Sequence, residues 1–182
     1  HSCQNRHRHA SHLLGLYPGN AITDKTPELI EACKVSLLDR GFGQKSGANG
    51  SGWGKANKVN LWARAKDGNR AYSMLRELIN KNIAPNLWDF HPPYQMDGNC
   101  GYTSGVCEML CYSSDDIIEL LPALPEEWKN GSVKGLCARG GYSLDFTWEN
   151  GEIKSLSVYS SCGKKTARIK TGDEIKTVKT VG

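Results

Sequence analysis

The stretch KANKVNLWARAKDGNRAYSMLRELIN, residues 55–80, decides the fold class of this chain. Its apolar side chains recur every three or four positions on both sides of Asp67-Gly68, a dipeptide typical of turns. The spacing predicts one helix from Lys55 to Lys66 and another from Asn69 to about Asn80. Because the link between them is so short, we expect the two helices to lie antiparallel, as in paired-helix architectures.

Two further helices are predicted around this pair. Thr26-Pro27 predicts a helix start, since a capping hydroxyl precedes a proline at the first helical position, and Gly41 predicts the end of that helix. The other helix is predicted from about Gly101 to Tyr112. The residues before it, 84–100, read APNLWDFHPPYQMDGNC, and a loop of this length inside a compact domain is usually functional.

Beyond Pro122 the pattern changes to the alternation typical of strands. Apolar residues occupy every second position from Tyr142 to Trp148, and Asn150-Gly151 then predicts a hairpin. Residues 166–170 predict another strand, and we expect residues 173–182 to fray. The chain is therefore predicted to be mainly α with a β tail. A helical part would cover residues 1–125, and a small antiparallel, β-sandwich-like part would cover residues 126–182.

The charge of the chain is nearly balanced. Its 182 residues carry 23 Lys and Arg against 19 Asp and Glu, and the net charge of +4 is too weak to indicate binding to nucleic acid or a membrane. The basic residues between 164 and 179 favour a solvated strand face over a polyanion site. No apolar run is long enough to span a bilayer. The first residue is His1 rather than Met, which indicates an internal fragment or a processed product.

The cysteines do not form a recognisable metal site. There are seven, an odd number, and no CxxC pair occurs, so the spacing of a zinc site is absent. Cys107 and Cys111 lie four apart on the last predicted helix, beside apolar residues. This placement favours free buried thiols over a metal site or a disulfide.

The first polar cluster contains three histidines, His7, His9 and His12, within six residues. Zinc would need a further ligand, which His91 or Asp97 could supply in principle. Hydrogen bonding to a polyhydroxylated ligand fits the cluster better, because sugars present many donors and acceptors. We therefore predict a sugar-binding role here and no metal.

Two more clusters could contact such a ligand. Trp53 stands between two glycines, so its ring could lie flat and stack on a sugar, although packing at a helix start explains it equally well. Residues 89–99 hold two carboxylates, a histidine, an amide pair and an aromatic ring around two adjacent prolines. Cleavage of a glycosidic bond needs a proton donor and a base for water, and Asp97 could present its carboxylate to a cleft. Capping of the following helix is the equal alternative for Asp97.

Five strings resemble consecutive motifs of glycoside hydrolase family 95: HRHASHLLGLYPGN, GWGKANKVNLWAR, NLWDFHPPYQMDGNCGYTSGVCEML, ELLPALPEEW and GLCARGGY. They follow one another across nearly all of residues 7 to about 160. The family holds inverting α-L-fucosidases acting on terminal, typically α-1,2-linked fucose, and some α-L-galactosidases. Its fold is an amino-terminal β-domain, an (α/α)6 barrel carrying the active site, and a carboxyl-terminal β-domain. The resemblance implies that the helices here are the closing helices of that barrel.

The resemblance also implies roles for single residues. Asp97 matches the aspartate on the base side, which acts with asparagines that position the attacking water. His9 and His91 match histidines that contact the sugar, and Trp53 and Asn99 complete the predicted substrate-binding set. The general acid glutamate and the paired asparagines lie upstream in the family, outside this chain. One departure is Cys100, where the family usually has Phe after the DGN triplet.

The function implied by the resemblance is hydrolysis of a terminal α-L-fucose by single displacement with inversion, without a cofactor. The expected partners are a fucosylated oligosaccharide or glycan and the upstream part of the same polypeptide, with no nucleic acid and no membrane. A secreted or periplasmic location of the full-length parent is expected. Two alternatives stay open: an α-L-galactosidase of the same family, and a non-catalytic sugar-binding or structural fragment, because the general acid is absent.

Overall fold

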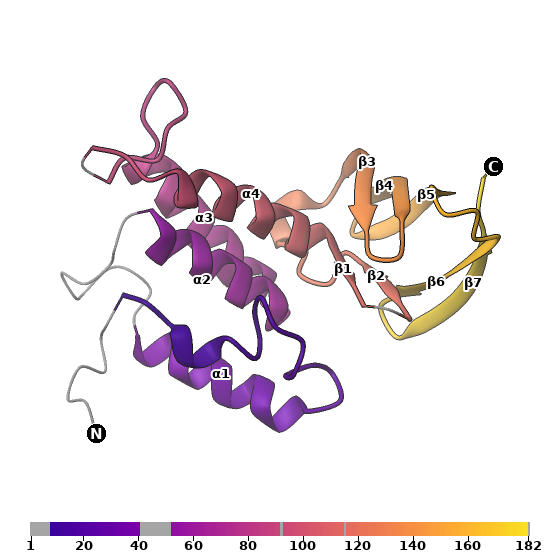
Figure 1. Cartoon of the computed structure of the whole chain (residues 1–182), viewed down its shortest axis with the longest axis horizontal. Helices are drawn as coiled ribbons and strands as arrows, with labels where there is room; N and C mark the ends of the chain where they lie inside the picture. The colour runs from indigo at the N-terminus through magenta and orange to yellow at the C-terminus, as the bar shows by residue number, and fades with distance from the viewer. Residues whose placement is uncertain (1–7, 41–51, 92, 115, 182) are drawn as a thin grey trace.

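The computed structural model describes residues 8–40, 52–91, 93–114 and 116–181. Within these residues, Figure 1 shows helices at one end of the molecule and strands at the other. The helical elements are a 3₁₀ turn η1 (Ser11–Leu13) and the helices α1 (Pro27–Asp39), α2 (Trp53–Arg64), α3 (Gly68–Asn82) and α4 (Met96–Leu110). In the described part of the chain, no helix has the length and apolar character needed to cross a membrane.

Helices α2 and α3 confirm the pair predicted around Asp67-Gly68. Asp67 caps α3, because its side chain accepts a hydrogen bond from the backbone N–H of Arg70 at 3.0 Å. Lys55, near the start of α2, donates to Oδ1 of Asn82 at the end of α3, over 2.8 Å. The two helices therefore run antiparallel, as the short link predicts.

Helix α4 packs closely along α2 because glycines line the contact. A Cβ on Gly101 would lie 2.8 Å from the Cβ of Ala56, and one on Gly105 would lie 2.5 Å from Cγ1 of Val59. Only glycine allows the two helices to come this close. The core beneath this contact is apolar, and it includes Leu16, Leu37, Val59, Leu61, Trp62, Met74 and Met109.

Some predicted details of the helices are wrong. The Thr26 hydroxyl does not cap α1, because it donates instead to the backbone oxygen of Thr23 over 3.1 Å. Helix α4 begins at Met96 rather than Gly101, so the last residues of the predicted loop are helical. It ends at Leu110 rather than Tyr112, since the next residues form a strand. The expected burial of Cys107 is also wrong, because that thiol is exposed. Gly41, the predicted end of α1, lies outside the described residues.

The strands form two sheets. One sheet has the order β1-β2-β6-β7 and the other the order β3-β4-β5. The strands and the turn η2 that precedes β3 are β1 (Cys111–Ser113), β2 (Ile118–Leu120), η2 (Glu126–Trp128), β3 (Gly131–Ala138), β4 (Tyr142–Glu149), β5 (Glu152–Ser160), β6 (Thr166–Thr171) and β7 (Glu174–Lys179). Asn150 and Gly151 link β4 to β5 with φ of 51° and 78°, which confirms the predicted hairpin.

Two features of the strands depart from the prediction. Strand β2 lies within residues 1–125, which are expected to be helical, and it pairs in parallel with β6 of the part that is expected to be antiparallel. Strand β7 occupies residues that were expected to fray, because the chain turns at Gly172 and β7 then pairs along β6. The core between the sheets is built from apolar side chains of both, including Ile118, Leu120, Leu144, Phe146, Trp148, Val158 and Ile169.

Candidate active site

The amino-terminal ends of α2 and α4 meet at the end of the helical part that lies away from the strands (Figure 1). A Cβ on Gly98 would lie 2.9 Å from the Cα of Gly52, so the two helix starts are in contact. Gln95, the residue before α4, accepts a hydrogen bond from the Trp53 backbone N–H at 2.9 Å. The loop between α3 and α4 lies at this junction and carries His91 to it.

Asp97 is exposed in the first turn of α4. The residue at the cap position is Gln95, so the alternative in which Asp97 merely caps the helix is wrong. A carboxylate in the first turn interacts favourably with the partial positive charge of a helix start. The side chain therefore stands at the surface on a rigid element.

The structure places Trp53 and Asn99 against the protein itself. The half-buried Trp53 ring packs on α4, where a Cβ on Gly101 would lie 3.1 Å from its Cζ3. The Asn99 side chain accepts from the Asp89 backbone N–H at 2.9 Å and donates to the Leu87 oxygen at 2.7 Å. Both ends of this amide thus hold the loop in place.

The predicted histidines, His9 and His91, come from different segments of the chain. Arg8 packs on Gly54 at the start of α2, because a Cβ built on Gly54 would lie 3.7 Å from the Cβ of Arg8. The Nε of Arg8 donates to Nε2 of His9 at 3.2 Å. His12 turns away to Oγ of Ser36 at 2.6 Å. Burial, helped by the charge of Arg40, lowers the pKa of His12. Among the described residues, no three His, Cys, Asp or Glu side chains gather as they would around a metal ion.

His91 is half-buried in the loop and interacts electrostatically with Asp89. His7, Pro92 and most of the glycine-rich link between α1 and α2 lie outside the described residues.

Two buried lysines give the start of α2 a positive character. Lys55 is 4% exposed and pairs with Glu77 of α3 at 3.2 Å. Lys58 donates to the backbone oxygen of Arg40 at 3.3 Å. Burial lowers the pKa of Lys58; Glu77 opposes this shift, and the charges of Arg40 and Lys55 add to it.

Asp89 is the residue of this region that sequence reasoning missed. Its side chain is completely buried, and burial raises the pKa of its carboxyl group, while the Gly52 N–H and the charges of His91 and Lys55 act in the opposite direction. A signal for it is the order Trp88-Asp89-Phe90. Successive side chains of an extended segment point to opposite sides, so the two exposed rings leave the aspartate facing inward.

Exposed aromatic and apolar side chains lie next to His91 and Asp97 along the chain. They are Leu87, Trp88, Phe90, Tyr94 and Met96. The rings of Trp88 and Tyr94 lie 4.8 Å apart between centroids, tilted by 36°. An exposed apolar patch of this kind marks an interaction surface, and aromatic faces can stack on the apolar face of a sugar ring.

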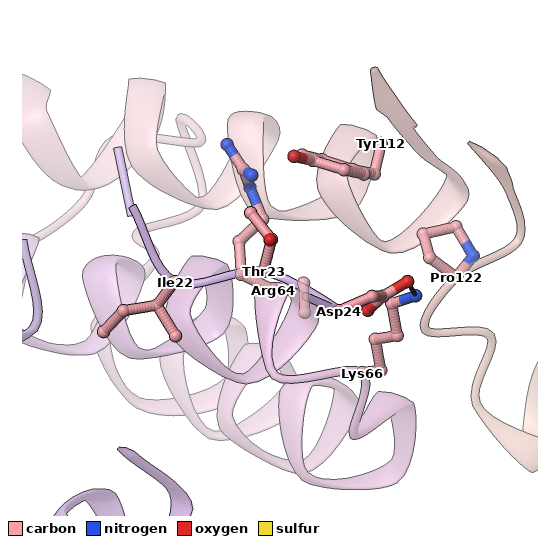
Figure 2. A pocket seen from close by; sticks show the side chains of 8 residues that line it. Ile22, Thr23, Asp24, Arg64, Lys66, Tyr112 and Pro122 are labelled. Atoms are coloured by element: carbon pink, nitrogen blue, oxygen red, sulfur yellow. Dashed lines mark hydrogen bonds and ion pairs between the residues drawn. The ribbon is translucent and has the colours of Figure 1, made fainter. Parts of the chain in front are cut away.

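A pocket at the opposite end of α2 does not suit a sugar. It lies between the loop before α1, the end of α2 and β1, and Figure 2 shows Asp24 and Lys66 pointing toward each other in it. These two groups form an ion pair at 2.6 Å. The free volume of about 20 Å³ is room for about one water molecule, so this pocket belongs to the joint between the helices and the strands.

Comparisons with known proteins cover nearly all of the chain. Residues 1–110 match the glycosyl hydrolase family 95 catalytic domain, and residues 112–181 match the glycoside hydrolase family 95, C-terminal domain. Alpha-L-fucosidase 2 of Arabidopsis thaliana is 38% identical over 167 residues, which is 85% of this chain and 19% of that protein.

Two proteins named probable alpha-fucosidase A are also similar. The one from Aspergillus oryzae is 35% identical over 168 residues, 80% of this chain and 23% of that protein. The one from Aspergillus niger is 33% identical over 184 residues, 90% of this chain and 23% of that protein. The chain therefore spans about a fifth of the length of the curated relatives that it matches.

Proposed function

The chain belongs to glycoside hydrolase family 95, and on that premise we propose that it is the carboxyl-terminal portion of an enzyme that releases terminal, typically α-1,2-linked α-L-fucose from glycans. The names of the similar proteins support fucose as the sugar. The observation that carries the proposal is Asp97, exposed on the first turn of α4 beside the exposed aromatic side chains of the preceding loop.

The proposal includes the architecture. Residues 1–125 close an (α/α)6 barrel with the helices that end at Leu110, and residues 126–182 form the carboxyl-terminal β-domain. Strands β1 and β2 belong to the first part by sequence and join the sheet of the second through β6. The upstream polypeptide supplies the rest of the barrel and the general acid. The short span of this chain relative to its relatives supports that arrangement.

The proposed reaction is a single displacement with inversion. Asp97 accepts a proton from a water molecule, whose oxygen forms a bond to the anomeric carbon. The bond from that carbon to the leaving oxygen breaks, and the upstream acid protonates the leaving oxygen. The first turn of α4 suits Asp97 to this role, because a carboxylate on a helix is held more precisely than one on a loop.

The sugar-binding residues are His9, His91, Trp53 and Asn99. The histidines would donate or accept hydrogen bonds with the hydroxyl groups of the sugar. Trp53 offers the part of its ring that does not pack on α4, because the residue is only half-buried. Asn99 contributes indirectly, by holding the loop in place, because both ends of its amide are hydrogen-bonded to the loop backbone.

The test is Asp97→Asn in the full-length enzyme, assayed for fucose release from a nitrophenyl α-L-fucoside and from an α-1,2-fucosylated oligosaccharide. We expect kcat to fall by roughly 10²–10⁴-fold, the usual contribution of a general base. The melting temperature should hardly change, because the side chain is exposed.

The matched control is Asp116→Asn, which changes an exposed aspartate beside β2 and should leave kcat unaltered. Near-normal turnover of the Asp97 variant would remove this residue from the base role. The same assay with the nitrophenyl α-L-galactoside separates the two sugar specificities, since these sugars differ by a hydroxyl on C6.

A further inference from the structure

Asp89 carries a buried carboxylate, and stability alone does not explain why a carboxylate is present there. The residue is 0% exposed, and among the described residues neither carboxylate oxygen has a partner with hydrogen-bond geometry. The Gly52 N–H faces the group and favours its charge without completing such a bond. A buried polar group left in this state costs free energy, and it calls for a functional reason.

The carboxylate lies between the starts of α2 and α4. A Cβ on Gly52 would lie 2.8 Å from its Oδ2, and a Cβ on Gly98 would overlap the group. Gly98 directly follows Asp97, so the buried carboxylate lies beneath the turn that carries the proposed base. A bulkier residue at either glycine would have no room.

The backbone of Asp89 fixes the residues on both sides of Asp97. Its N–H donates to Oδ1 of Asn99 at 2.9 Å, and its oxygen accepts from the Gln95 N–H at 3.0 Å. Gln95 in turn bonds to the start of α2. The loop, α2 and the first turn of α4 are thereby held as one unit.

The charged groups that face Asp89 come from two elements. Lys55 of α2 and His91 of the loop both favour its ionised form, and the helix starts add their partial positive charges. On α4 the titratable neighbour is Asp97, whose side chain is exposed. An ionised Asp89 therefore interacts favourably with Lys55 and with the ring of His91, and His91 is the neighbour that shares its loop.

We propose that Asp89 is a positioning residue, which holds Asp97 and His91 in their reactive arrangement through an ionised carboxylate buried under the start of α4. This inference rests on the proposed function and deepens it. Asp89 acts without touching the substrate. Misplacement of a reacting group by about 1 Å can cost about 10²-fold in rate, which sets the scale of the expected effect.

The test is Asp89→Asn in the full-length enzyme, which keeps the shape of the side chain and removes its charge. We expect kcat to fall by about 10–100-fold. Burial raises the pKa of Asp89 in the folded state, so the folded state binds this proton more tightly than the unfolded state does. The folded state therefore loses stability as the pH rises through the raised pKa. The variant escapes this loss, so its melting temperature at pH 7 should be equal or higher.

The pH profile gives a readout that a merely structural role would not change. If activity needs ionised Asp89, the acid limb of kcat/KM in the wild type reflects the raised pKa of that group. In Asp89→Asn the limb should move to lower pH. The control is Asp67→Ala, which removes the cap of α3 and should lower the melting temperature without changing kcat or the acid limb.

Two results would overturn the inference. One is wild-type kcat with an unmoved acid limb in Asp89→Asn, and the other is a loss of activity that follows a lowered melting temperature, which would make Asp89 structural. Fucose release by the wild type and its loss in Asp97→Asn would still support the proposed function in both cases. Absence of fucose release by the wild type would instead count against the function.

Discussion

At the scale of single residues, two carboxylates at one helix start have opposite surroundings. Asp97 is exposed on the first turn of α4, whereas Asp89 is buried beneath that turn. The motif around Asp97 predicts its place in the site from sequence alone. The order Trp88-Asp89-Phe90 indicates that Asp89 faces inward, but its place between the two helix starts could not be predicted. That place depends on Gly52 and Gly98 meeting in space, and these residues are far apart in the chain.

Trp88 is expected to contribute to binding of the glycan and not to the chemical step. Its ring is 50% exposed and lies beside Tyr94, so it is available for stacking. Trp88→Ala in the full-length enzyme should raise KM for a fucosylated oligosaccharide by about 5–10-fold, from a loss of about 1–1.5 kcal/mol, with kcat retained. Steady-state kinetics measure both constants. Trp88→Phe should keep most of the affinity, and a fall in kcat at unchanged KM would contradict the stacking role.

At the scale of elements, the contact between α2 and α4 depends on residues without side chains. Gly105→Ala should destabilise the enzyme by about 1–3 kcal/mol, because the new methyl group would meet Cγ1 of Val59 at 2.5 Å. Alanine favours helix over glycine, so any loss must come from packing between the helices. Thermal unfolding measures the effect.

The control for this change is Cys107→Ala, which alters an exposed position of the same helix and should shift stability by less than about 0.5 kcal/mol. An unchanged melting temperature in Gly105→Ala would show that the two helices can move apart at no cost.

The elements also show where sequence patterns stop being informative. Helical spacing predicts α2 and α3 because each helix hides its own apolar stripe, and Asn150-Gly151 predicts its hairpin through local backbone preference. Strand β1 follows α4 directly and becomes a strand only because β2 pairs with it. Strand β7 is largely exposed, so its pattern is weak, and its pairing with β6 defines it.

At the scale of the whole molecule, ion pairs join the helices to the strands. Asp24 pairs with Lys66 at the end of α2 and with Lys170 of β6, at 2.6 Å and 2.9 Å. Glu119 of β2 binds the same two lysines at 2.8 Å and 3.2 Å. The four side chains form a closed network across the joint and hold the two parts together there.

This joint should weaken in acid. Burial alone would raise the pKa of Asp24, but the hydrogen bonds and charges of Lys66 and Lys170 outweigh it and lower the pKa below its ordinary value of 3.8. A carboxyl group whose pKa is lowered in the folded state stabilises that state at pH values above its ordinary pKa. This stabilisation is lost as the pH falls through the lowered pKa. Asp24→Asn should therefore lower the melting temperature slightly at pH 7, by less than about 1 kcal/mol in stability since Asp24 is half exposed.

The difference between wild type and Asp24→Asn should disappear below the lowered pKa, where the wild-type carboxyl is also neutral. Thermal unfolding at several pH values, with 1 M salt as a second condition, measures it. A difference that persists unchanged in strong acid would show that the shape of the side chain matters rather than its charge.

The isolated 182-residue chain is expected to release no fucose. It holds the proposed base side of the site, whereas the resemblance places the acid upstream, and the chain spans about a fifth of its relatives. An assay of the purified chain beside the full-length enzyme checks this. Fucose release by the chain alone would contradict the division of the site, and calorimetric titration with fucose would show whether the chain still binds the sugar.

The parallel pairing of β2 with β6 has a consequence for synthesis on the ribosome. Residues 118–120 emerge first, but their neighbour in the sheet, residues 169–171, emerges only after the intervening strands β3, β4 and β5. Until then the β1–β2 hairpin has an open edge, and such an edge can pair with another chain. A protein chain truncated before residue 166 would lack β6, so the edge of β2 would stay open. We expect this chain to be prone to aggregate, although it contains every helix of the described structure.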